Sequence, residues 1–227
     1  RELFVLVHDL PYGGWARAGR FALPYGWRLP DHTAFTRRGT FDQYRQGYGV
    51  EAGVAANEAW GNLALWAQGI DGWPGDNQPP GAGVSAQAGV RRLGYTLGAS
   101  AHTMAGRDGT ANEYMMGPMW GLNLRPMSYL GEISWRRTND DGFVVDGLAV
   151  LHEARFPHFV RGLAPKVRWE WNDPDVLVRG DQRQRVLLGV EWNPYRYVQL
   201  DLAYRRLVVP GGRDASELLL QMHSWVF

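Results

Sequence analysis

Apolar and polar residues alternate along most of this chain, which is typical of β-strands with one apolar and one polar face. The strongest segment sets apolar residues against polar residues and glycine, with Val186, Leu188, Val190 and Trp192 opposite Arg185, Gly189, Glu191 and Asn193. The next segment repeats the pattern, with Val198, Leu200, Leu202 and Tyr204 opposite Gln199, Asp201, Ala203 and Arg205. No stretch of similar length has the period of an amphipathic helix, and no linker divides the chain. We therefore predict one all-β domain over residues 1–227.

Thirteen segments are predicted to be strands. They cover roughly residues 2–9, 14–23, 46–57, 60–70, 82–92, 95–105, 113–125, 127–137, 143–155, 160–172, 182–193, 196–208 and 215–227.

The predicted connections alternate between short and long. The short ones lie near Asn57, Gly94, Pro126, Pro157 and Pro194, and the longer ones span about 24–45, 71–81, 106–112, 138–142, 173–181 and 209–214. Outer-membrane barrels have this asymmetry, because their periplasmic turns are tight and their outside loops are longer. A soluble β-sandwich has no reason to alternate in this way. The predicted fold is therefore a transmembrane antiparallel up-and-down β-barrel.

The odd number of predicted strands leads to a further expectation. Bacterial single-chain barrels have an even number of strands, with both ends normally in the periplasm. If residue 227 lies in the periplasm, counting back through the predicted strands leaves residue 1 outside. We expect at least one more strand upstream, so that the chain is the C-terminal part of a larger barrel of about 14 strands or more. The alternative is a barrel of about 12 strands, in which residues 2–9 are not a strand.

Composition agrees with a barrel and excludes several other classes. No apolar run approaches the roughly 20 residues that a spanning helix needs. The 11 tryptophans suit the bilayer interface, where an indole ring is buried and its N–H stays wet. The 24 basic residues nearly balance the 23 acidic ones, so the chain lacks the basic excess of a nucleic-acid-binding protein. Because cysteine is absent, the chain has no disulfide, no thiolate zinc site and no covalently attached haem.

The C-terminal segment, which runs from Glu217 to Phe227, is predicted to be the last strand. A terminal Phe227 with Trp225 two residues before it resembles the sorting signal of bacterial outer-membrane β-barrels. The resemblance implies that the protein is located in the bacterial outer membrane. It also implies that Phe227 is an assembly signal read by the barrel assembly machinery.

A second resemblance lies in residues 19–39, which read Gly-Arg-Phe-Ala-Leu-Pro-Tyr-Gly-Trp-Arg-Leu and, after Pro30, Asp-His-Thr-Ala-Phe-Thr-Arg-Arg-Gly. This segment resembles one in the phosphate-selective porin family, where a strand ending in Gly-x-Phe leads through Pro, an aromatic residue and Gly into a loop. The resemblance implies a porin. The basic constriction residues of that family have no evident matching positions here, and Lys166 is the only lysine, so a phosphate preference does not follow.

The 24–45 connection is the longest and is the best candidate for a functional segment. Its charged candidates for a pore constriction are Arg28, Arg37, Arg38, Arg45, Asp31 and His32. If the segment folds into the lumen, it narrows the pore, and its charges set the selectivity. The alternative is a solvated outside loop whose arginines pair with carboxylates or lipid phosphates.

The alternation assigns further residues to two faces. The candidates for the lumen are Glu51, Arg91, Glu132, Arg136, Lys166, Arg168, Glu170, Arg185, Glu191, Asp201 and Arg205. Opposite charges on neighbouring strands can pair, so each of these residues is also a candidate for a structural ion pair. The candidates for the membrane girdle are Trp120, Trp135, Trp169, Trp171, Trp192 and Trp225.

Three functions are compatible with these patterns. The first is an outer-membrane porin for small hydrophilic solutes or ions, which needs no cofactor and no covalent chemistry. The second is a porin-like sheath around a multihaem cytochrome, which would be its partner. The third is a barrel enzyme, but the chain has no Gly-x-Ser-x-Gly elbow and no His-Glu-x-x-His metal motif. Outer-membrane lipids and a second copy of the chain are further expected partners.

Overall fold

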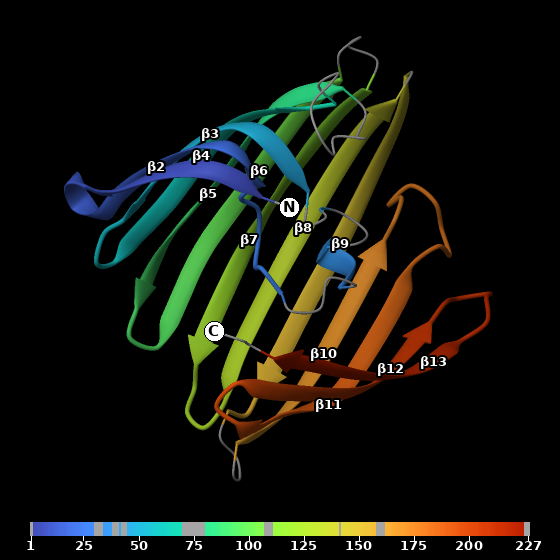
Figure 1. Ribbon diagram of the computed structural model, residues 1–227. Coiled ribbons are helices and arrows are strands. Elements are labelled where there is room, and N and C mark those ends of the chain that lie inside the picture. Colours follow the sequence, from blue (N-terminus) through green and yellow to red (C-terminus); the bar gives the residue numbers. More distant parts are fainter. Residues whose placement is uncertain are drawn as a thin grey trace.

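The computed structural model describes residues 2–29, 34–37, 41, 45–69, 80–106, 111–140, 142–157 and 162–224. These residues form a single antiparallel sheet in which each strand pairs with its neighbours in the sequence (Figure 1). The strands are β1 (Leu3–Leu10), β2 (Gly14–Ala22), β3 (Gln46–Ala55), β4 (Ala59–Gln68), β5 (Gly81–Arg92), β6 (Tyr95–Gly106), β7 (Ala111–Asn123), β8 (Ser128–Asp140), β9 (Phe143–Arg155), β10 (Leu163–Asp173), β11 (Arg183–Tyr195), β12 (Val198–Val208) and β13 (Ala215–Ser224). A single 3-10 turn, η1 (Pro11–Gly13), joins β1 to β2.

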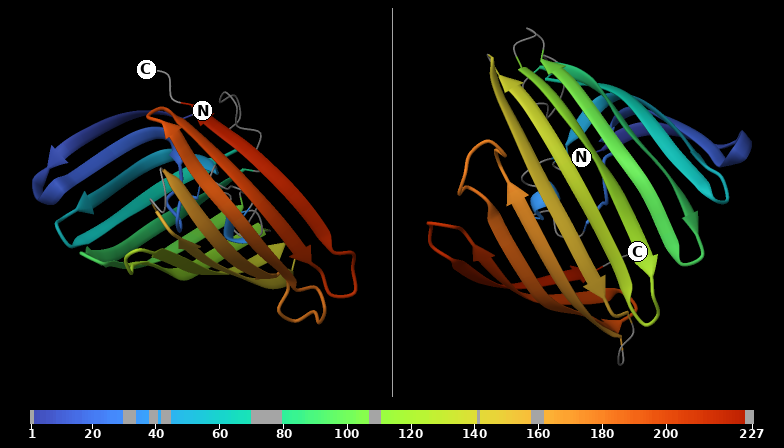
Figure 2. Two further views of the ribbon diagram at one scale, coloured as in Figure 1. Left: turned by 90° about the horizontal axis from the view of Figure 1, so that it is seen from below. Right: turned by 180° about the vertical axis from the view of Figure 1, so that it is seen from behind.

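The sheet curls strongly about the strand direction, and the blue segment between β2 and β3 lies on its concave side (Figure 2). Among the described residues, β1 and β13 do not pair with one another, so both are edges of the sheet. The described residues also contain no helix that is long and apolar enough to cross a membrane.

The prediction of 13 antiparallel strands is confirmed. Two predicted connection lengths are wrong. Residues 138–142 were expected as a longer connection, but β8 and β9 pair up to Asp140 and Phe143, so only residues 141–142 lie between the strands. Gly142 has φ +86°, which suits a tight hairpin turn. The connection near Pro157 was expected to be short, but residues 156–162 separate β9 from β10.

The two faces of the sheet differ in chemistry, as the period of two requires. Large apolar side chains project from the convex face, including Val5, Leu188 and Leu220, which are 73%, 53% and 70% exposed. The concave face carries charged and polar residues, many of them buried beneath the segment between β2 and β3. A continuous apolar outer surface is unfavourable in water and favourable in a bilayer.

Candidate functional site

The segment between β2 and β3 forms the centre of the site, and we refer to its described residues, 23–29, 34–37, 41 and 45, as the inner segment. They lie against the concave face instead of extending into solvent, and most of them are buried (Figure 1). Of the two positions considered from the sequence, the described part of the segment therefore adopts the inward one.

Apolar contacts hold the inner segment to the wall. Tyr25 stacks on Phe41 with 4.9 Å between ring centroids, and Phe41 meets the edge of His102, also at 4.9 Å. Tyr25 and Phe41 belong to a buried cluster that joins the segment to β2, β4 and β7. It consists of Phe21, Leu23, Tyr25, Phe41, Ala64, Trp66 and Met115. A second cluster contains Leu29, Ala34 and Leu151, with Trp27 and Leu130 packed against it. This apolar core explains why the segment docks instead of moving freely.

Hydrogen bonds fix the first turn of the inner segment against β6 and β8. The Tyr25 hydroxyl lies 2.8 Å from Ser134 Oγ, and the Gly26 amide donates to Ser100 Oγ at 2.8 Å. The Trp27 amide donates to Glu132 Oε2 at 2.9 Å. Burial raises the pKa of Tyr25 above the ordinary value, so its phenol stays neutral. Three consecutive residues are thus bound to two strands.

Residue 26 has a backbone conformation and close neighbours that favour glycine. Its φ of +58° lies in the left-handed region that disfavours side chains. A Cβ atom there would also lie 2.4 Å from Arg37 Nη2 and 2.4 Å from Glu132 Oε1. A side chain at residue 26 would therefore have to displace the Arg37 guanidinium and the Glu132 carboxylate.

Arg37 closes the inner segment onto itself and onto the wall. Its guanidinium pairs with Glu132 and donates to the carbonyl oxygens of Trp27, at 2.8 Å, and Thr36, at 2.9 Å. Because the charges of Arg37 and Glu132 are both buried, each needs the other to offset the loss of water. The pair joins the beginning and the middle of the segment to β8.

Two further groups of charges surround the inner segment. Arg45 Nη1 lies 2.6 Å from Glu113, and Arg136 Nε lies 3.2 Å from the other oxygen of the same carboxylate. On the opposite side, Glu170 accepts a hydrogen bond from the Phe35 amide at 3.2 Å and pairs with Arg185. One carboxylate on β7 and one on β10 therefore bind the segment from two directions.

The predicted constriction residues lie in different environments or outside the described part of the chain. Arg37 and Arg45 lie on the concave side in the ion pairs just described. Arg28 is exposed and donates to the Ala22 carbonyl oxygen at 3.3 Å. Arg38, Asp31 and His32 lie outside the described residues.

The predicted lumen residues all occupy concave-face positions in the strand register. Most of them are in ion pairs: Glu51 with Arg17, Glu132 with Arg37, Arg136 with Glu113, Lys166 with Asp201, Arg168 with Glu153, Glu170 with Arg185, Glu191 with Arg155, and Arg205 with Glu217. Arg91 is exposed near the end of β5, where its amide donates to the Glu58 carbonyl oxygen at 2.7 Å. The concave wall is thus rich in charge but low in net charge.

The predicted girdle residues on described strands, Trp120, Trp135, Trp169, Trp171 and Trp192, occupy convex-face positions. Trp169 and Trp192 are 37% and 42% exposed. His152 lies between Trp169 and Trp120, with ring centroids at 5.6 Å and 5.7 Å. Trp225 and the proposed assembly signal Phe227 lie outside the described residues.

Sequence reasoning missed the residues that receive the inner segment. Ser100 and Ser134 bind its first turn, and His102 packs under Phe41. His102 also bonds to Ser85 Oγ through Nδ1 at 2.7 Å. The only signal was that these polar residues fall on the concave side of the alternation. That signal does not identify their partners, because the inner segment is distant in sequence.

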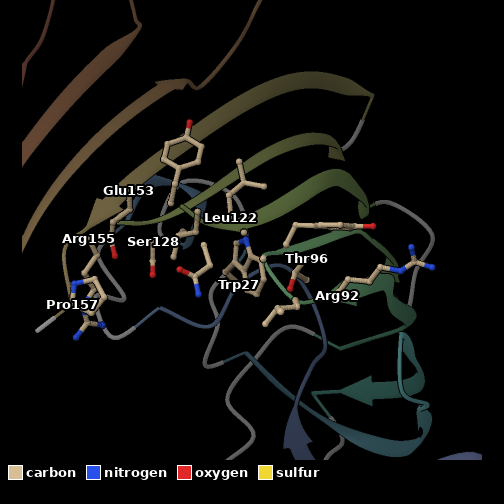
Figure 3. A pocket seen from close by; sticks show the side chains of 15 residues that line it. Trp27, Arg92, Thr96, Leu122, Ser128, Glu153, Arg155 and Pro157 are labelled. Carbon is tan, nitrogen blue, oxygen red and sulfur yellow. The ribbon is translucent and has the colours of Figure 1, made fainter. Parts of the chain in front are cut away.

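A cavity of about 650 Å³ lies on the concave side next to Trp27, near the ends of β5, β7 and β9 (Figure 3). Trp27 lies in the middle of the view, with Ser128 toward one side and Thr96 toward the other. Glu153 and Arg155 lie at one end and Arg92 at the opposite end. The cavity therefore has an aromatic centre and polar groups along its length.

Known proteins with the same fold belong to the outer membrane. An anion-selective porin from Comamonas acidovorans superposes with a TM-score of 0.75 at 11% identity, over 99% of this chain and 78% of the porin. OmpT, an outer-membrane protein of Vibrio cholerae, gives a TM-score of 0.75 at 11% identity, over 99% of this chain and 81% of OmpT. The outer-membrane channel DcaP of Acinetobacter baumannii gives 0.60 at 10% identity, over 92% and 71% of the two chains.

No protein-family model and no curated protein matches the chain. The structural matches show a porin-type outer-membrane β-barrel fold. The finer resemblance to phosphate-selective porins stays a prediction.

Proposed function

We propose that the protein is a porin of the bacterial outer membrane, through which small hydrophilic solutes and ions diffuse without covalent chemistry. One observation carries the proposal: a strand wall that is apolar outside and charged inside holds the inner segment on its concave face through buried contacts. A segment anchored in this way narrows a water-filled lumen without being swept out of it. The similarity of the fold to an anion-selective porin and to an outer-membrane channel supports this function.

The same geometry favours a pore over a sheath around a cytochrome. The inner segment and its two apolar clusters occupy space on the concave side that an enclosed protein would need. An enzyme is not supported either, because the concave charges described above are engaged in ion pairs. In the described residues, no group of three or more His, Asp or Glu side chains could hold a metal ion.

The pairing of charges also predicts the selectivity. An anion preference, the property named for the Comamonas porin, requires an excess of positive charge along the path. Here Arg37 and Arg45 are offset by Glu132 and Glu113, and the formal net charge of the chain is +1. We therefore expect weak selectivity between anions and cations.

Single-channel recording in a planar lipid bilayer tests the proposal. Purified protein should produce stable open steps in potassium chloride, and a salt gradient should give a reversal potential close to zero. A protein that inserts into the bilayer but produces no steps would show that the barrel is closed, and the porin function would be wrong.

A further inference from the structure

We propose that the cavity beside Trp27 binds an uncharged polyhydroxylated solute of about the size of a mono- or disaccharide. The cavity volume of about 650 Å³ lies within the range typical of small-molecule sites, ~300–1,000 Å³. The inference rests on the proposed porin function and adds the class of solute that the pore would bind on its path.

Trp27 offers a rigid aromatic surface for such a solute. Its amide donates to Glu132, and its indole Nε1 donates to the Gly131 carbonyl oxygen at 3.1 Å. Its ring also packs against the cluster of Leu29, Ala34 and Leu151. Because the ring is already held in place, a solute that stacks on it loses little free energy to side-chain ordering. The apolar C–H face of a sugar ring fits such a surface.

Gly121 lies on the cavity wall beside the indole. A Cβ atom at Gly121 would lie 3.6 Å from the Trp27 ring, which is an ordinary van der Waals contact. A side chain at residue 121 would therefore start from an unstrained Cβ position and extend into the space beside the ring. This position provides a way to fill the cavity while Trp27 stays in place.

Neutral hydrogen-bonding groups surround the aromatic surface. Thr96, Asn123 and Ser128 line the cavity from β6, β7 and β8. Each side chain can both donate and accept a hydrogen bond, as a sugar hydroxyl does. Within the described ranges, none of these three side chains is engaged in a hydrogen bond. They are therefore available to a solute.

The charges of the cavity are already compensated. Glu153 lies 2.6 Å from Arg168, and Arg155 pairs with Glu191. At the other end, Arg92 lies 2.8 Å from Glu58. An ionic solute would have to compete with these pairs, whereas a neutral solute can accept or donate hydrogen bonds at their edges. The combination of an aromatic face, neutral polar groups and paired charges favours an uncharged solute with many hydroxyls.

Current recording with maltose as the probe tests the inference in the full chain. Maltose should interrupt the ion current in a saturable way. The maltose concentration that halves the current should rise at least about tenfold in Trp27→Leu, which corresponds to a loss of about 1.4 kcal/mol. Gly121→Val, which fills the cavity, should weaken the effect similarly, and Thr96→Val and Ser128→Ala should weaken it severalfold. Trp15→Leu alters another concave-face tryptophan, outside this cavity, and should leave the effect unchanged.

Three outcomes would overturn the inference. Poly(ethylene glycol) of equal size could interrupt the current as strongly as maltose, or Trp27→Leu and Gly121→Val could leave the maltose effect unchanged. The third is that glucuronate, which is charged, acts at a lower concentration than maltose. A channel that conducts salt but ignores maltose would leave the porin function intact and refute the site. If the protein does not conduct, calorimetric titration of the detergent-solubilised chain with maltose decides the site separately. Saturable heat that Trp27→Leu abolishes would support the site, although the porin function would then be wrong.

Discussion

Arg37 and Glu132 form an ion pair inside the protein in which the side chains are only 0% and 2% exposed. One residue lies in the inner segment and the other on β8, 95 positions apart in the sequence. Since each buried charge is stabilised mainly by the other, the pair couples the position of the inner segment to the wall of the barrel.

Breaking this pair should release the inner segment. Arg37→Met leaves the Glu132 charge buried without its partner and should cost about 3–5 kcal/mol of stability. The single-channel conductance should rise and become noisier, because the segment no longer holds one position. Denaturant unfolding and bilayer recording measure the two effects. Arg137→Met removes an exposed partner of Asp146 from the convex side and should change neither. Equal effects in both variants would contradict the anchoring role.

The position of Gly26 should tolerate no side chain. Gly26→Ala adds a Cβ atom only 2.4 Å from Arg37 and Glu132 and should therefore disturb the ion pair as well as the backbone. Gly142→Ala is the matched control, because Gly142 also has a positive φ but has nothing within 4 Å of a Cβ atom. The control should lose only about 1–2 kcal/mol of stability, which is the cost of a side chain in the left-handed backbone conformation. If Gly26→Ala loses more stability than Gly142→Ala and also alters the conductance, the additional loss comes from the clash with the ion pair and not from the backbone dihedral angle.

The neutral phenol of Tyr25 should make stability depend on alkaline pH. Burial raises the pKa of Tyr25 in the folded protein, whereas an unfolded tyrosine ionises near pH ~10. Above that pH the unfolded state binds fewer protons than the folded state, so the free energy of unfolding should fall as the pH rises. Tyr25→Phe should lose this part of the slope. Unfolding midpoints of both proteins at pH 8 and pH 11 measure it. An identical pH dependence in the two proteins would refute the effect.

The carboxylate of Glu113 should keep the pore from preferring anions. Its carboxylate offsets the positive charges of Arg45 and Arg136, so Glu113→Gln leaves an additional positive charge near the inner segment. The reversal potential in a potassium chloride gradient should shift toward the anion value. Glu58→Gln changes an exposed carboxylate paired with Arg92 and should shift it less. A shift toward cations in Glu113→Gln would contradict the proposed path.

The strands could be predicted from the sequence because their pattern is local. β9 was predicted as residues 143–155 and is observed from Phe143 to Arg155. The prediction was accurate because every second residue of a strand faces the same environment, apolar on one side and polar on the other. The lengths of the connections were less predictable. The hairpin at Gly142 is tight because strand pairing continues to its base, and that pairing depends on a neighbouring strand instead of on the local sequence.

The sequence by itself determined which residues face each side of the sheet, because the alternation of a strand follows from its own backbone geometry. It indicated that Arg37 and Glu132 were functional candidates, but it related neither to the other. Only the tertiary structure decided that the inner segment turns inward, that Gly26 touches this ion pair, and that Trp27 borders a cavity next to β7. These contacts join positions about 100 residues apart, and they form only when the curled sheet brings several strands around the inner segment.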